Sequence, residues 1–187
     1  MLPGFTVRSA NLGMRTALLV GLLMTCAVAQ AAQFSIDAVK AAYLFRFTSY
    51  VEWPVGEEGD SSDFIIGVVG AEDVAVHLDR LLAGMTVGQR AARVRRVRNV
   101  EDLKDVRILY VGARVFRGSH TLRALTRSKP ILLVTDNPLG LEGGGVINFI
   151  EVDRNLRFEI SLVAADRNGL KIDSALLSVA ARVTKTP

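Results

Sequence analysis

The residue types that most often do chemistry in proteins are sparse in this chain of 187 residues. It contains two histidines, His77 and His120, and a single cysteine, Cys26. Isolated histidines without partner cysteines or an H-x-x-x-H spacing make a poor metal site. No G-x-S-x-G segment is present, and Ser119 would face away from its neighbour His120 on a helix. The sequence therefore contains no recognisable catalytic residues, and it predicts no metal and no cofactor.

The glycine-rich segments do not have the form of phosphate-binding loops. Val69–Asp73 follows a predicted strand and opens a predicted helix, as a nucleotide-binding turn does. It lacks the G-x-G-x-x-G pattern, and its two acids would repel a phosphate. Gly143–Gly145 is not followed by Lys-Ser or Lys-Thr, so a flexible turn into a strand is the better interpretation.

The positive charge of the chain is concentrated in one short segment. The net charge is +4, from 23 basic and 19 acidic residues. A basic strand can meet anionic lipid or an acidic protein, but a solvated edge that blocks strand-to-strand aggregation is the favoured interpretation. So small an excess does not support binding to nucleic acid. The arginines of this segment are Arg90, Arg93, Arg95, Arg96 and Arg98.

The first thirty residues have the pattern of an export signal. Residues 1–15 contain two arginines and no acid, and residues 17–28 are dominated by Leu, Val, Ala and Met. Small residues in an A-x-A arrangement follow, which is typical of a secretory signal peptide. The apolar run is shorter than the roughly 20 residues of a membrane span, so an uncleaved anchor is less favoured. We predict cleavage after Ala29 or Ala31, a signal peptide over residues 1–31 and an exported mature protein.

The mature chain, residues 32–187, has the pattern of one α/β domain. Continuous apolar runs bounded by glycine are typical of strands buried on both faces of a parallel sheet, and Asp153–Asn155 suits a hairpin turn. The sequence predicts a layered sheet of about six strands, largely parallel with a late antiparallel hairpin, with helices packed on it. Strands are expected at 64–69, 94–97, 107–111, 131–135, 146–151 and 156–163, and helices at 35–51, 71–83, 115–127 and 173–183.

Aromatic residues gather along the first predicted helix and just after it. Tyr43 and Phe47 fall on its apolar stripe, which predicts that they pack in the core. Phe45 and Trp53 fall off that stripe. Packing is the favoured interpretation for them too, and the alternative is that either lines a pocket or a partner surface. A concave apolar pocket at one of these two residues would favour a small-molecule ligand.

The last predicted strand, residues 156–163, alternates strictly between apolar and polar residues. Leu156, Phe158, Ile160 and Leu162 share one face, and Arg157, Glu159 and Ser161 share the other. We expect a carboxylate on that polar face to pair in the neighbourhood of Arg157 or to face water, and the alternative is that it anchors a partner.

Several segments, taken in order, resemble one family of exported bacterial proteins. The opening KAAYLFRFTSYVEWP (residues 40–54) and the closing GGGVIN (143–148), RFEISL (157–162) and GLKIDSALL (169–177) are the most specific. The strands 64–70, 108–112 and 130–136 fit between them. In this set, which spans about residues 38–183, the chain resembles the YfiR-like family.

The resemblance implies a periplasmic regulator without catalytic activity. Members of this family bind the periplasmic sensor domain of an inner-membrane diguanylate cyclase and hold it inactive, which keeps cyclic di-GMP and biofilm formation low. An outer-membrane lipoprotein releases the cyclase by removing the repressor, and members are typically homodimers. On this resemblance Glu159 is the leading candidate for partner binding, with Phe158 and Ile172 supporting it from the core.

One departure from the family bears on regulation. Many members carry two cysteines that suit redox control, and the matching positions here are Gly67 and Val106. The resemblance therefore implies that a disulfide switch is absent, whereas repression by binding can survive that loss. The main alternative is a periplasmic small-molecule-binding subunit that feeds another membrane sensor, such as a histidine kinase. An enzyme with an unrecognised site is the least favoured alternative.

Overall fold

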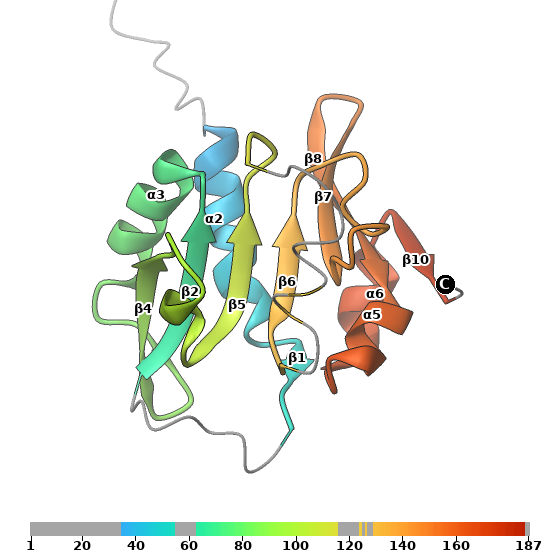
Figure 1. The fold of residues 1–187 in the computed structure, drawn as a ribbon. Helices are drawn as coiled ribbons and strands as arrows, with labels where there is room; N and C mark the ends of the chain where they lie inside the picture. The colour runs from blue at the N-terminus through green and yellow to red at the C-terminus, as the bar shows by residue number, and fades with distance from the viewer. Residues whose placement is uncertain (1–34, 55–62, 116–123, 125, 127–128, 186–187) are drawn as a thin grey trace, which may run out of the picture. The chain divides into compact units, whose positions relative to one another are not determined.

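The computed structural model describes residues 35–54, 63–115, 124, 126 and 129–185 (Figure 1). The predicted signal peptide over residues 1–31, with its cleavage positions Ala29 and Ala31, lies outside the described residues. So do His120 and most of the helix expected at 115–127.

The fold is a mixed α/β sheet with helices packed on it, as the sequence predicts. Its central strands β4, β2, β5, β6 and β7 run parallel, and the hairpin of β7 and β8 is antiparallel. Among the described residues the main sheet has eight strands rather than about six, because short edge strands carry too few residues to show a periodicity. In spatial order they are β10 (Arg182–Thr184), β8 (Asn155–Ser161), β7 (Ile147–Val152), β6 (Leu132–Thr135), β5 (Val106–Val111), β2 (Asp63–Val69), β4 (Arg90–Arg96) and β3 (Thr86–Val87).

Apolar residues are buried on both faces of the central strands. Successive side chains of a strand point to opposite faces, so a continuous apolar run needs cover on both. Helices α2 (Ile36–Phe47) and α3 (Glu72–Leu82) pack over one face, which Ile66, Ile108 and Val134 line. Leu103, in the short helix η1 (Glu101–Leu103), packs with Ile65, Leu109 and Leu133 in the cluster on the other face.

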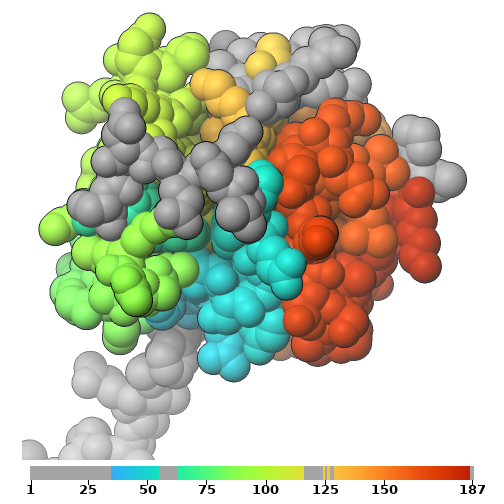
Figure 2. Space-filling view, turned by 90° about the horizontal axis from the view of Figure 1, so that it is seen from below, coloured from blue at the N-terminus to red at the C-terminus, as the bar shows by residue number. Residues whose placement is uncertain are grey.

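Helix α2 begins where the sequence predicts and ends earlier. Ser35 caps it by accepting a hydrogen bond from the backbone N–H of Ala38 at 3.1 Å. The expected continuation to residue 51 is wrong, because the chain turns after Phe47 and enters β1 (Val51–Glu52). That strand pairs with β9 (Lys171–Ile172), which places the end of the α2 segment beside the C-terminal part of the chain (Figure 2).

The C-terminal segment also departs from the sequence prediction. The strand expected to reach residue 163 ends at Ser161, whose hydroxyl accepts from Ala164 N–H and begins helix α5 (Leu162–Arg167). The helix expected at 173–183 is α6 (Ser174–Val179), capped by Asp173. Residues 182–184 then return to the sheet as β10 beside β8. Pairing between β8 and β10 determines where the C-terminal elements begin and end. Such pairing between distant residues leaves no local pattern in the sequence.

The order of the strands creates an opening at one end of the sheet. From β2 the chain crosses to β4 on one side, and it then returns to β5 on the other side of β2 before continuing to β6 and β7. The connections after β2 and β5 therefore leave in opposite directions. In open α/β sheets ligands bind outside the carboxyl ends of the strands at such a reversal.

The aromatic cluster under α2 gives a direct test of the core. Phe47 is fully buried, with its ring centroid 5.5 Å from that of Phe158 and 6.0 Å from that of Phe149. We expect Phe47→Ala to lower the free energy of unfolding by about 3–5 kcal/mol, measured by urea denaturation, because it opens a cavity. Phe45→Ala, in the same helix at a half-buried position, is the control. An equal loss in both variants would contradict the packing described here.

Candidate functional site

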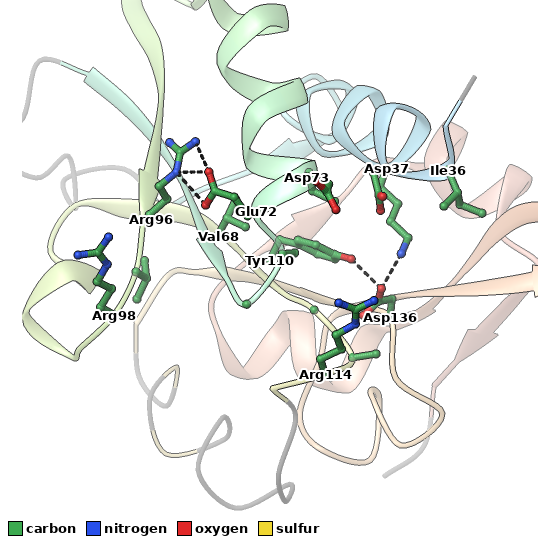
Figure 3. A pocket seen from close by; sticks show the side chains of 17 residues that line it. Ile36, Asp37, Val68, Glu72, Asp73, Arg96, Arg98, Tyr110, Arg114 and Asp136 are labelled. Atoms are coloured by element: carbon green, nitrogen blue, oxygen red, sulfur yellow. Dashed lines mark hydrogen bonds and ion pairs between the residues drawn. The ribbon is translucent and has the colours of Figure 1, made fainter. Parts of the chain in front are cut away.

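A cavity of about 630 Å³ lies at the carboxyl ends of β2, β4, β5 and β6, where the strand order reverses. We call it the strand-end cavity. The first turns of α2 and α3 border it, and it contains charges of both signs (Figure 3). Its charged and aromatic lining residues are Asp37, Lys40, Glu72, Asp73, Arg96, Arg98, Tyr110, Arg114 and Asp136.

At the base of the cavity two side chains converge on one carboxylate oxygen of Asp136. The Lys40 ammonium donates to Asp136 Oδ2 at 2.6 Å, and the Tyr110 hydroxyl donates to the same oxygen at 2.7 Å. Asp136 Oδ1 is buried and has no hydrogen-bond partner among the described residues. The three residues come from α2, β5 and the end of β6, so this contact ties the helix to the sheet.

The surroundings of Tyr110 favour its protonated form. Burial raises the pKa of Tyr110 far above its ordinary value, and the neighbouring Asp136 carboxylate adds to the effect. A phenolate there would lose solvation and would face a negative charge. The hydroxyl therefore remains a hydrogen-bond donor to Asp136 over the whole physiological pH range.

On the β4 side of the cavity, two arginines of the basic segment pair with nearby acids. Arg96 donates to Glu72 Oε1 at 2.7 and 2.9 Å, to Glu72 Oε2 at 3.1 Å and to Asp79 Oδ2 at 2.8 Å. These hydrogen bonds lower the pKa of Glu72. Arg93 pairs with Asp63 at 2.6 Å. The solvated edge expected at 94–97 belongs to a longer strand, β4, whose first two residues are covered by β3 and whose residues 94–96 pair with β2 only.

A row of polar side chains crosses the sheet away from the cavity. Thr135, Asn148, Glu159 and Arg182 face one another in register on β6, β7, β8 and β10. Thr135 Oγ1 donates to Asn148 Oδ1 at 2.7 Å, and Asn148 Nδ2 donates to Glu159 Oε1 at 3.0 Å. Arg182 Nε donates to Glu159 Oε2 at 2.9 Å. Each buried polar group in this row therefore has a partner, as burial requires.

Glu159, the leading partner-binding candidate from the sequence, lies inside this row. Its side chain is only 7% exposed, whereas the side chain of Arg182 that covers it is 65% exposed. Phe158 is buried in the aromatic core. Ile172 is half-buried and pairs with Val51 in the two-stranded sheet. The expected alternation of this strand is confirmed for Phe158 and Ile160, which lie in the core opposite to Glu159.

The other residues singled out from the sequence lie apart from these two sites. Trp53 lines a separate cavity of about 460 Å³ with Phe64 and Val87, and its indole N–H donates to the Arg107 carbonyl at 3.3 Å. Phe45 is half-buried against the core. His77 Nε2 lies 3.1 Å from Ser35 Oγ, between α3 and the start of α2. No cluster of potential metal ligands occurs among the described residues.

A family model described as YfiR/HmsC-like matches residues 37–181. The chain belongs to the YfiR/HmsC-like family. A search among curated proteins finds no match to this chain. The matched range begins in α2 and ends just before β10, so it includes every element that borders the strand-end cavity and all of the polar row except Arg182. Membership of the YfiR/HmsC-like family supports a regulatory role.

The positions that match the cysteines of many YfiR-like proteins are neighbours in this structure. A Cβ atom built on Gly67 would lie 3.1 Å from Val106 Cγ1, across the pairing of β2 and β5. The closeness of these two positions in space is consistent with the resemblance, in which they match the two cysteines of many members.

Sequence reasoning did not find the group of Lys40, Tyr110 and Asp136 at the base of the cavity, although two of these residues carry a signal. Asp136 directly follows a buried strand, and Tyr110 is the one residue with a polar tip near the end of another. Lys40 has no such signal, because its role depends on where α2 packs.

None of the helices in the described part of this YfiR/HmsC-like chain has the length and apolar character that a membrane crossing requires.

The raised pKa of Tyr110 predicts how the stability of the folded protein changes at alkaline pH. Both the folded and the unfolded chain hold this proton below pH about 10, whereas only the folded chain keeps it above that value. The stabilising contribution of Tyr110 is therefore present below pH about 10 and falls as the pH rises further. We expect Tyr110→Phe to cost about 1 kcal/mol at pH 8. That difference should shrink at pH 11 in urea denaturation, and a constant difference would contradict the assignment.

Proposed function

We propose that this chain is an exported, non-catalytic regulator that binds the periplasmic sensor domain of an inner-membrane diguanylate cyclase and represses synthesis of cyclic di-GMP. Biofilm formation is thereby kept low. The observation that carries this proposal is the YfiR/HmsC-like family match over residues 37–181. Residues 1–31 then serve as a cleaved signal peptide ahead of a single domain, residues 32–187, in the periplasm. A homodimer, and an outer-membrane lipoprotein that relieves repression, complete the proposal.

The proposed partner surface lies at the β8–β10 edge of the sheet. A buried carboxylate is a poor direct contact, so Glu159 acts in this proposal through Arg182. It holds the guanidinium of Arg182 in place at the surface, where that cation faces the partner. A preorganised arginine is a common anchor at protein interfaces, because little side-chain entropy is lost on binding. Phe158 and Ile172 support the same segment from the core and from β9.

Charge substitution at Glu159 tests this surface. Glu159→Gln keeps the shape and the hydrogen bond from Asn148 but weakens the hold on Arg182, so we expect weaker binding to a purified cyclase sensor domain by calorimetry. Arg182→Ala should weaken binding at least as much. Glu151→Gln, an exposed carboxylate on the same hairpin, is the matched control. Folded Glu159 and Arg182 variants with wild-type affinity would remove this edge from the interface.

The cellular role is tested by measuring cyclic di-GMP in the native host. Deletion of the gene should raise cyclic di-GMP, because the cyclase loses its repressor. Complementation with the full chain should reverse the rise, whereas a version lacking residues 1–31 should not, since it stays on the wrong side of the membrane. An unchanged nucleotide level in the deletion strain would contradict the proposal.

A second candidate function is a periplasmic small-molecule-binding subunit that feeds another membrane sensor, such as a histidine kinase. Two observations favour it. One is the cavity of about 460 Å³ lined by Trp53, Phe64 and Val87, and the other is the strand-end cavity of about 630 Å³. Both volumes lie within the range of small-molecule sites. Unchanged cyclic di-GMP together with loss of a different membrane-sensor response in the deletion strain would favour this candidate.

A further inference from the structure

The strand-end cavity contains unpaired charges of opposite sign on different structural elements. We propose that it binds a small zwitterion, a molecule with a primary ammonium at one end and a carboxylate or phosphate at the other. The inference does not depend on the identity of the protein partner, because it concerns a ligand of this chain alone.

The negative side of the cavity is formed by the two helices. Asp37 lies in the first turn of α2 and Asp73 in the first turn of α3. Figure 3 shows both carboxylates on the helix side of the Tyr110 hydroxyl. Within the part of the chain that the structure describes, neither carboxylate has a salt-bridge partner. Two carboxylates around one space suit an ammonium group, which has three donors.

The positive side is formed by the loops that follow the strands. Arg98 follows β4 and Arg114 follows β5, and both side chains are exposed at the cavity. Neither guanidinium forms an ion pair with another described residue. A guanidinium offers donors in a planar fork that matches a carboxylate or a phosphate.

The remaining charged side chains of the cavity are already in ion pairs with one another or with Asp79. Lys40 is paired with Asp136, and Arg96 is paired with Glu72 and Asp79. With four basic and four acidic lining residues, the formal charges cancel. A simple anion would be attracted by Arg114 and repelled by Asp73, and a simple cation would meet the reverse. Only a ligand with both signs gains at both sides, which is the electrostatic reason for preferring a zwitterion.

The position and the size of the cavity agree with this ligand class. It lies where the strand order reverses, the usual ligand position in open α/β sheets. Small residues, Gly70, Ala71, Gly112 and Ala113, line the cavity at the strand ends. A volume of about 630 Å³ accommodates a small molecule that reaches from the helix side to the loop side.

A series of ω-amino acids measures the spacing of the two charges. Glycine, β-alanine, 4-aminobutyrate and 6-aminohexanoate are titrated by calorimetry into the protein purified from cells that export it, with O-phosphoethanolamine as the phosphate arm. We expect the affinity to peak at one chain length. Butylamine and butyrate, which carry one charge each, should bind about tenfold or more weakly than that best ligand.

Two pairs of variants decide whether binding occurs in this cavity. Asp73→Asn and Arg114→Gln should each weaken the best ligand about tenfold or more, because each removes one charge-assisted contact. Asp166→Asn and Arg154→Gln, at exposed positions elsewhere, should bind as wild type. Circular dichroism checks that all four fold.

Three outcomes would overturn the proposal. They are no binding at any chain length, equal binding of the singly charged molecules, and wild-type affinity in both cavity variants. None of them bears on the binding of a cyclase sensor domain, which Glu159 and Arg182 test separately.

Discussion

The fold depends on the burial of both faces of its central strands. β2, β5 and β6 are almost entirely apolar, and each stable arrangement of such strands needs a layer on either side. Helices α2 and α3 cover one face, and the aromatic rings of Tyr43, Phe47, Phe149 and Phe158 interlock beneath α2. Because both faces of the sheet are covered, charged and polar side chains gather at the ends of the strands, where the strand-end cavity lies.

Two polar groupings are joined through three consecutive residues. Thr135 belongs to the row that leads to Glu159 and Arg182, Asp136 is bound by Lys40 and Tyr110 in the cavity, and Asn137 N–H donates to Asn148 Oδ1 at 3.1 Å. Gly140 packs against this junction so closely that an added Cβ would lie 2.1 Å from Thr135 Oγ1 and 2.3 Å from Asn148 Oδ1. The proposed partner edge and the proposed ligand cavity are thus connected through the same turn after β6.

Folding also determines which charges of the molecule are paired and which are left unpaired. In the basic segment, the most conspicuous charged feature of the sequence, Arg93 pairs with Asp63 and Arg96 pairs with Glu72 and Asp79 once the chain folds. The cations that remain at the cavity, Arg98 and Arg114, come from loops rather than from that strand's interior. Recognition by this protein therefore depends less on its net charge than on which few charges folding leaves without a partner.

The sequence by itself determined the class of the fold and the long elements. Continuous apolar runs marked β2, β5 and β6, the cap at Ser35 marked the start of α2, and the ordered set of segments marked the family. These signals are local patterns of residues, so they can be recognised in the sequence without knowledge of the fold. Tertiary structure alone decided the short strands β1, β3, β9 and β10, the burial of Glu159 behind Arg182, and the meeting of Lys40, Tyr110 and Asp136. Such features arise from pairing between segments that are distant in the sequence. This pairing leaves no periodic pattern in a single sequence.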